Sequence, residues 1–169
     1  MAYGEKCGCQ LIEKELADEG IIPYCEMCGE YRFPLSNTAV SMIVLSPDQT
    51  KILLIQQYGK MDWILVAGYV NQKECLEDAL HREYREEIGR SIMRMQYMKS
   101  AYFEASNTLM CNYVILSDSI SLQALHRQEV DEAKWFSFAQ ARQEIKQNSL
   151  AQHFLYYFME EWEKGNIRL

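Results

Sequence analysis

The stretch of sequence that decides the fold reads GYVNQKECLEDALHREYREEIG and covers residues 68–89. Apolar side chains recur in it at every fourth position, at Leu76, Leu80, Tyr84 and Ile88. This period predicts a helix over residues 75–88 with one apolar face. Gly89 then ends the helix, because glycine readily adopts the left-handed conformation that commonly closes one. We therefore expect the helix to bury one side and to leave the other available.

The available side carries three clustered carboxylates. Glu83, Glu86 and Glu87 stand at positions i, i+3 and i+4, which are neighbours on a helix. Like charges this close repel, and Arg82 and Arg85 offset only part of the charge. Two interpretations are open on the cluster alone: a solvated, salt-bridged helix face, or a site where carboxylate oxygens bind Mg²⁺ or Mn²⁺.

The spacing of charged residues and glycines favours the second interpretation. Seven positions set this spacing: Gly68, Glu74, Arg82, Glu83, Glu86, Glu87 and Gly89. All seven match the Nudix box, so the chain resembles a Nudix hydrolase. Two neighbouring positions depart from the family pattern, since Arg90 stands where an aliphatic residue is usual and Tyr84 where a smaller one is.

The resemblance implies a loop–helix–loop that holds divalent metal and hydrolyses a nucleoside diphosphate linked to another moiety. The three clustered glutamates would be the metal-binding carboxylates, and the carbonyl of Gly68 would be an additional ligand. Glu74 would pair with Arg82 and orient the helix. One glutamate would help to deprotonate the attacking water, and the sequence leaves open which one.

The rest of the chain predicts a mixed α/β (α+β) fold. Apolar and β-branched runs predict strands at residues 38–46, 51–58, 63–68, 99–103, 109–117 and 133–137. The turn sequence SPDQT joins the first two as a hairpin. Residues 137–164 predict two helices broken near Asn148–Ser149. A sheet covered by helices follows, and the resemblance implies a Nudix-type α/β/α sandwich over residues 36–169.

Two similar phrases, YGEKCG at residues 3–8 and YCEMCG at residues 24–29, indicate a separate N-terminal module. Residues 3–33 are expected to be rich in loops. The NADH pyrophosphatase-type branch of the Nudix family carries a four-cysteine zinc ribbon just before the Nudix domain, and residues 1–34 resemble such a ribbon. We therefore expect a structural Zn²⁺ there, because thiolates suit zinc better than they suit Mg²⁺.

Four cysteines are the candidate zinc ligands. Cys25 and Cys28 have the Cys-x-x-Cys spacing that lets two thiolates reach one ion. The first phrase offers Cys7, but Gly4 stands where its partner would be. Cys9 is the candidate for the fourth ligand. The alternatives are water, a ligand from another chain, or a module without zinc.

Two later segments indicate a substrate contact and a further metal ligand. SAYFEASNTLM, residues 100–110, resembles a motif of the same branch without its three prolines and its glutamine. Tyr102 and Phe103 would stack on a base or a nicotinamide ring, or else pack as ordinary strand aromatics. EVDEAKWF, residues 129–136, is similar to a segment common in the superfamily. Glu129 would then reach the metals from outside the helix, the alternative being a surface residue before a strand.

Charge and hydropathy limit the classes of binding partner and the cellular location that we expect. A formal net charge of −7 argues against nucleic acid, while a divalent cation would still let an acidic site hold a phosphorylated substrate. The sequence has no apolar run near the roughly 20 residues of a membrane span and no apolar signal segment, so we expect no membrane association and a cytoplasmic location. The resemblance adds the expectation of a homodimer.

These features favour a metal-dependent pyrophosphohydrolase that cleaves the diphosphate of a nucleoside diphosphate derivative, with an NAD(H)-like dinucleotide as one candidate. ADP-ribose and nucleotide sugars are alternative substrates. A nucleotide-sensing Nudix regulator without turnover is the alternative from another class. The clustered glutamates argue against it, because a site without catalysis has no need to crowd like charges.

Overall fold

The computed structural model describes the chain except residues 1, 2, 5, 34 and 123–128. The chain divides into two compact units, Met1–Ser36 and Asn37–Leu169. The expected end of the zinc-ribbon-like module, residue 34, lies outside the described residues. Each unit has its own sheet.

The larger unit is built around a mixed sheet. Its strands are β4 (Asn37–Leu45), β5 (Lys51–Gln57), β6 (Val66–Tyr69), β7 (Ile92–Phe103), β8 (Thr108–Ser117) and β9 (Val130–Ser137). The order is β7-β8-β4-β5-β9, and β6 also pairs with β4. β4 runs parallel to β8 and antiparallel to β5 and β6. The predicted hairpin of β4 and β5 is confirmed. In its turn, the Ser46 hydroxyl donates to Asp48 (2.6 Å) and accepts from the Lys51 N–H (3.0 Å).

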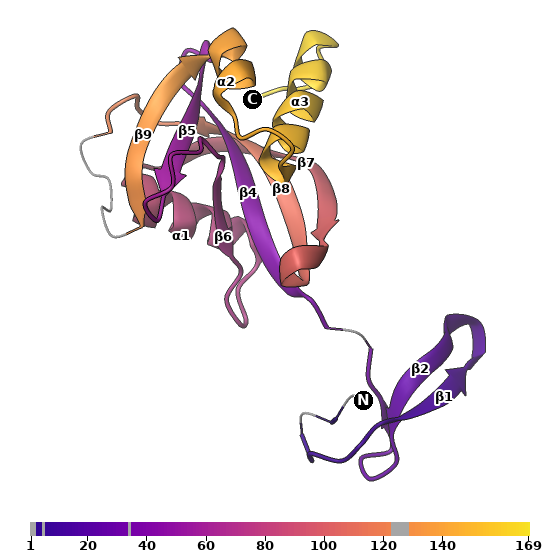
Figure 1. The fold of residues 1–169 in the computed structure, drawn as a ribbon. Helices are drawn as coiled ribbons and strands as arrows, with labels where there is room; N and C mark the ends of the chain where they lie inside the picture. Colours follow the sequence, from indigo (N-terminus) through magenta and orange to yellow (C-terminus); the bar gives the residue numbers. More distant parts are fainter. Residues whose placement is uncertain (1–2, 5, 34, 123–128) are drawn as a thin grey trace. The chain divides into compact units, whose positions relative to one another are not determined.

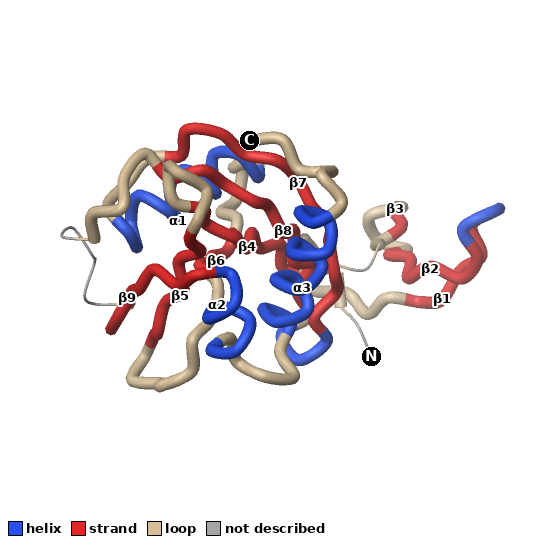
Figure 2. Tube along the Cα trace, turned by 90° about the horizontal axis from the view of Figure 1, so that it is seen from above, coloured by secondary structure: helices blue, strands red, loops and turns tan. Residues whose placement is uncertain are grey.

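Helices cover both faces of this sheet (Figures 1 and 2). α1 (Leu76–Ile88) lies on one face, and α2 (Phe138–Glu144) and α3 (Leu150–Glu163) lie on the other. Side chains of β4 alternate between the two cores: Val40, Met42 and Val44 pack on the α1 side, and Ile43 and Leu45 on the α2–α3 side. A strand buried on both faces reads as a continuous apolar run. The predicted α/β/α sandwich is confirmed, and none of the helices in the described residues is long and apolar enough to cross a membrane.

The ends and the core face of α1 follow from local signals. Cys75 caps its start by accepting a hydrogen bond from the backbone N–H three residues on (3.4 Å), and Gly89 closes it in the left-handed conformation, with φ of 70°. Tyr84 is fully buried, and its hydroxyl donates to the Ser117 hydroxyl of β8 at 2.7 Å. The Arg90 side chain donates to a loop carbonyl at 2.7 Å. Both departures from the family pattern are therefore accommodated by hydrogen bonds.

Three predicted strand starts were wrong, and one of them is that of β9, which begins at Val130 and not at residue 133. β7 begins at Ile92 and not at residue 99, and its first half carries polar residues with no side chain fully buried. The apolar alternation that reveals a strand is weak in such a segment. β6 covers only Val66–Tyr69, because Trp63 and Ile64 make isolated bridges instead.

The smaller unit is not the loop-rich segment that we expected. It contains a three-stranded antiparallel sheet of β1 (Ile12–Leu16), β2 (Gly20–Cys25) and β3 (Glu30–Tyr31). The rings of Tyr24 and Tyr31 meet edge to face at 4.9 Å, and the Lys14 ammonium lies 3.9 Å from the centre of the Tyr24 ring. Side chains of β1 are mostly exposed. A strand solvated on both sides lacks the alternating pattern, and its charged sequence concealed it.

Candidate active site

The carboxylate side of α1 borders a cleft of about 720 Å³. The apolar side of the helix is buried in the core, which sets the rotation of the helix and turns the three clustered glutamates to the cleft. Gly68 of β6 and Glu129, the residue before β9, line the same cleft. The fold thus brings together the candidate metal ligands from three separate parts of the chain.

Gly68 lies directly against one of these glutamates. A Cβ atom added at Gly68 would overlap the carboxyl group of Glu83. Gly68 pairs with Val40 in the ladder between β4 and β6, so its backbone cannot easily move away. The position therefore needs glycine for close approach rather than for an unusual backbone angle.

Arg82 connects the start of the Nudix-like segment to the helix. Its Nε and Nη2 atoms donate to the two carboxylate oxygens of Glu74, at 2.8 and 2.9 Å. Its Nη1 atom donates to Glu83 at 2.7 Å and to Glu86 at 3.1 Å. The bidentate pair with Arg82, helped by the backbone N–H of Asn71, lowers the pKa of Glu74 to about 2. One guanidinium therefore orients three carboxylates at once.

Glu87 is the most confined of the clustered glutamates, with only 3% of its surface exposed. One of its carboxylate oxygens accepts a hydrogen bond from the Gln57 side chain at 2.9 Å. The other is buried without a hydrogen-bond partner in the described residues. Burial and then the charge of Glu83 raise the pKa of Glu87 to about 8. A buried carboxylate oxygen without a partner is costly, and a divalent cation would satisfy it.

Burial and neighbouring carboxyl groups raise other pKa values in the cleft as well. The pKa of Glu83 is raised, mainly because the side chain is buried, although Arg82 opposes the effect. The pKa of the Tyr58 hydroxyl is raised by burial and then by the charges of Glu129, Glu87 and Glu83. Carboxylates are hard oxygen donors, so this set fits Mg²⁺ or Mn²⁺ rather than a soft metal.

The structure separates the two aromatic candidates for substrate contact. Phe103 lines the cleft. Tyr102 is exposed, and its hydroxyl donates to the Asn107 side chain at 2.5 Å. Neighbouring residues of a strand point to opposite faces, so β7 cannot turn both rings to one cleft.

The sequence analysis missed several cleft residues, and three of them bear directly on the carboxylates and on the charge of the lining. Gln57, at the end of β5, holds Glu87, and Lys60 and Lys146 bring positive charge to the lining. The Lys146 ammonium pairs with Asp62 at 2.8 Å. The only signal for Gln57 was a polar residue at the end of an apolar strand, and nothing in the sequence marked the two lysines.

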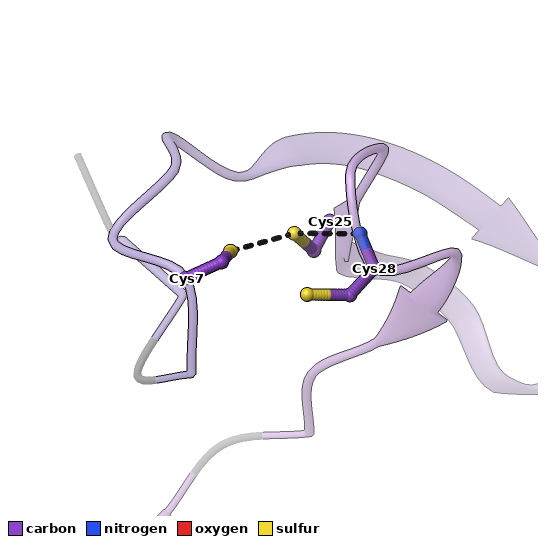
Figure 3. Close-up of side chains that lie close together, drawn as sticks. All are labelled: Cys7, Cys25 and Cys28. Atoms are coloured by element: carbon purple, nitrogen blue, oxygen red, sulfur yellow. Dashed lines mark hydrogen bonds between the residues drawn. The ribbon is translucent and has the colours of Figure 1, made fainter.

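In the smaller unit, three cysteines form a cluster (Figure 3). The Sγ atoms of Cys7, Cys25 and Cys28 lie within 4.8 Å of one another. Those of Cys7 and Cys25 are 3.4 Å apart. A hydrogen bond with the Cys9 backbone, and then hydrogen bonds with the other two thiols, lower the pKa of Cys7 to about 7. The donor set of three thiols suits Zn²⁺.

Cys9 lies outside this cluster. Its thiol donates to the Met27 sulfur at 3.4 Å and lies 3.9 Å from the Cys7 carbonyl. The Cys9 thiol thus interacts with the Cys7 thiol, but it is not part of the group of three whose sulfurs lie within 4.8 Å of one another. A Cys-x-Cys pair has one residue fewer than Cys-x-x-Cys with which to turn both side chains onto one ion.

Comparison with known proteins adds named relatives. NAD-capped RNA hydrolase NudC of Pseudomonas aeruginosa is 23% identical over 150 residues, which are 88% of this chain and 53% of that protein. Human NAD-capped RNA hydrolase NUDT12 is 30% identical over 107 residues, 62% of this chain and 23% of that protein. The chain thus spans about half the length of the bacterial relative and about a quarter of the human one.

Solved structures and a family model agree on the fold. A NUDIX hydrolase from Nitrosomonas europaea superposes with a TM-score of 0.63 at 18% identity, over 75% of this chain and 90% of that one. The NUDIX domain of Shewanella oneidensis NrtR, solved with ADP ribose, gives 0.62 at 19% identity, over 85% and 94%. The model of the NUDIX domain matches residues 35–163, a span that holds the sheet, α1 and the carboxylate cleft. On this match the chain belongs to the NUDIX family.

Proposed function

We propose that the chain is a metal-dependent pyrophosphohydrolase that cleaves the diphosphate of a nucleoside diphosphate derivative. The observation that carries the proposal is the buried oxygen of Glu87 that has no hydrogen-bond partner among the described residues, set in a cleft beside Glu83 and Glu86. Such an oxygen needs a positive partner, and a divalent cation shared by the three carboxylates would supply one.

The ligands in this proposal come from three elements. Glu83, Glu86 and Glu87 of α1 would bind Mg²⁺ or Mn²⁺, together with the Gly68 carbonyl and Glu129. When bound, the cation would neutralise charge that develops on the phosphate oxygens as the diphosphate breaks.

Side chains of the cleft orient the metal-binding carboxylates and bind the substrate. Arg82 holds the carboxylates in register, and one carboxylate accepts a proton from the attacking water. Lys60 provides positive charge for phosphate groups at the cleft, and Lys146, which pairs with Asp62, lines the same cleft. Phe103 provides a ring on which a base or a nicotinamide stacks.

An NAD(H)-like dinucleotide is the substrate class we propose first. The bacterial and the human relative are both named as hydrolases of NAD-capped RNA, although this chain matches very different shares of the two proteins. The shared name supports a substrate with a dinucleotide diphosphate. ADP-ribose and nucleotide sugars are the alternatives, since they contain the same diphosphate bond. A regulator that binds a nucleotide without turnover is the alternative outside enzymes.

A turnover screen tests the proposal. The protein is assayed with NADH, NAD⁺, ADP-ribose, nucleotide sugars and diadenosine polyphosphates, each with Mg²⁺ or Mn²⁺. We expect Glu87→Gln to lower kcat by roughly 100-fold or more. Glu77→Gln is the matched control, because Glu77 is an exposed glutamate of the same helix outside the cleft lining. Binding of a nucleotide with no hydrolysis of any compound by the folded, metal-loaded protein would favour the regulator.

We also propose that Cys7, Cys25 and Cys28 hold a structural Zn²⁺ and that residues 1–34 form a zinc-ribbon-like module. The mutual distances of the three thiols and their soft character support this assignment. Zinc analysis of folded protein purified without chelator tests it, and a zinc-to-protein ratio near zero would refute it. Cytoplasmic location and a homodimer stay predictions, and light scattering in solution measures the second.

A further inference from the structure

We infer that zinc on the three-cysteine cluster keeps one coordination position open beside Gly4, and that an exchangeable small donor from solution fills this position. The inference rests on the proposed zinc site and goes beyond it. It assigns a place where an external ligand, such as water, an imidazole or a small thiol, binds the metal. A structural zinc site normally has four protein ligands and no such place.

The two cysteine phrases fold into the same turn. In the second phrase, the Gly29 N–H donates to the Cys25 carbonyl at 2.8 Å, and Gly29 has φ of 68°. In the first phrase, the Gly8 N–H donates to the Gly4 carbonyl at 2.7 Å, and Gly8 has φ of 67°. Residue 4 therefore stands in its turn where Cys25 stands in the other, and Cys7 corresponds to Cys28.

Gly4 also faces the cluster in space. A Cβ atom added to this buried residue would lie 3.2 Å from the Cys7 sulfur and 3.7 Å from the Cys25 sulfur. Sulfurs of a tetrahedral zinc site lie roughly 3.8 Å apart, as follows from a Zn–S distance of about 2.3 Å. A side chain on residue 4 would therefore start next to the cluster, and glycine leaves this side of the cluster without a fourth donor from the described residues.

Cys9 does not supply the fourth zinc ligand in this structure. Its carbonyl accepts a hydrogen bond from the Gly4 N–H at 2.8 Å, which fixes its backbone. Its thiol lies 3.4 Å from the Met27 sulfur and also interacts with the Cys7 thiol, but it is outside the group of three sulfurs within 4.8 Å of one another. The cluster therefore offers three thiolates to one ion, with a net charge of −1 from Zn²⁺ and three thiolates. Zinc completes its tetrahedron with water or another small donor when proteins supply only three ligands.

Cobalt substitution of the full chain tests the inference, because Co²⁺ in a thiolate site absorbs visible light in a way that depends on the donor set. We expect the cobalt spectrum of the unmodified protein to change on addition of imidazole or 2-mercaptoethanol. X-ray absorption of the zinc form should count three sulfurs and one lighter donor. Both readouts are independent of hydrolase activity.

Variants at residue 4 sharpen the test. Gly4→Cys should give four sulfurs, lose the response to added ligand and bind zinc roughly tenfold more tightly or better. Gly4→Ala is the matched control, because it adds the Cβ without a donor, and it should respond like the unmodified protein. The Gly4 backbone is outside the left-handed region, so its conformation admits both side chains, and the Cys7 sulfur, 3.2 Å from the added Cβ, has to shift by a few tenths of an ångström in both variants.

Contrary outcomes are distinct from one another. Four sulfurs and no ligand response in the unmodified protein, with the count falling to three in Cys9→Ser, would make Cys9 the fourth ligand and overturn the inference while the zinc proposal stands. A folded protein that takes up neither Co²⁺ nor Zn²⁺ would overturn the zinc proposal and the inference with it.

Discussion

Replacing Gly68 by alanine tests the close approach on which the carboxylate cluster depends. The added methyl group would overlap the Glu83 carboxyl group, and Gly68 is held in the ladder with β4. The carboxyl group has to retreat by roughly 1.5 Å before carbon atoms reach a contact of about 3.5 Å. We expect this shift to break the 2.7 Å hydrogen bond between Arg82 and Glu83.

The size of the effect follows from these two changes. Overpacking a dense site costs about 1–3 kcal/mol, and loss of a hydrogen bond to a charged group costs about 1.5–3 kcal/mol. The two costs are not added, because the movement that relieves the clash is the same movement that breaks the hydrogen bond. We therefore expect Gly68→Ala to lower the free energy of unfolding by about 2 kcal/mol. A misplacement of about 1 Å at a catalytic group lowers kcat by roughly 100-fold.

Denaturant unfolding and steady-state kinetics with Mg²⁺ measure the two effects. The control is a double-mutant cycle with Glu83→Ala, which removes the group that the methyl meets. In that background, Gly68→Ala should cost no more than about 0.5 kcal/mol. Equal costs in both backgrounds, or a Gly68→Ala protein with kcat within a factor of about two of the unmodified one, would refute the reasoning.

Three further predictions concern the surroundings of the same helix. Gln57→Leu, which removes the hydrogen bond that orients Glu87, should lower kcat about tenfold and weaken Mn²⁺ binding measured by electron paramagnetic resonance; unchanged binding would contradict the role. With a pKa of about 8, folded Glu87 holds its proton more tightly than it does unfolded. The metal-free protein should therefore lose stability as pH rises from about 4.5 to 8. Glu87→Gln should flatten that slope of Tm against pH, and an identical slope would exclude Glu87 as its source. Tyr84→Phe removes the hydroxyl that meets Ser117 and should cost about 1 kcal/mol in denaturant unfolding, with kcat little changed; a large loss of kcat would place Tyr84 in the active site instead.

Much of the larger unit could be predicted because its signals are local. The four-residue period of α1, its closing glycine and the continuous apolar run of β4 each depend on neighbours in sequence. The break between α2 and α3 follows from Ser149, whose side chain caps α3. The strands that were misjudged, β1 and the first half of β7, are polar and partly solvated. Their pairing is decided by a partner strand and not by their own composition.

The candidate site also has a part that the sequence predicted and a part that it did not. The spacing of the glutamates on α1 was readable, because a helix converts spacing directly into a shared face. The partners of those glutamates were not. Gln57 comes from β5 and Glu129 from the segment before β9, and only the sheet order brings them to one cleft. The strand register likewise turned Phe103 to the cleft and left Tyr102 outside its lining.

By itself the sequence determined the kind of chemistry, because carboxylates at fixed helical spacing and thiols in a repeated phrase define hard and soft metal donors wherever they fold. Only the tertiary structure decided how complete each donor set is. It buried an oxygen of Glu87 that has no hydrogen-bond partner among the described residues, and it placed Gly4 against a three-thiol cluster whose group of mutually close sulfurs leaves out Cys9. The physical reason is that burial and the distance between residues far apart in sequence are properties of packing, which no local pattern encodes.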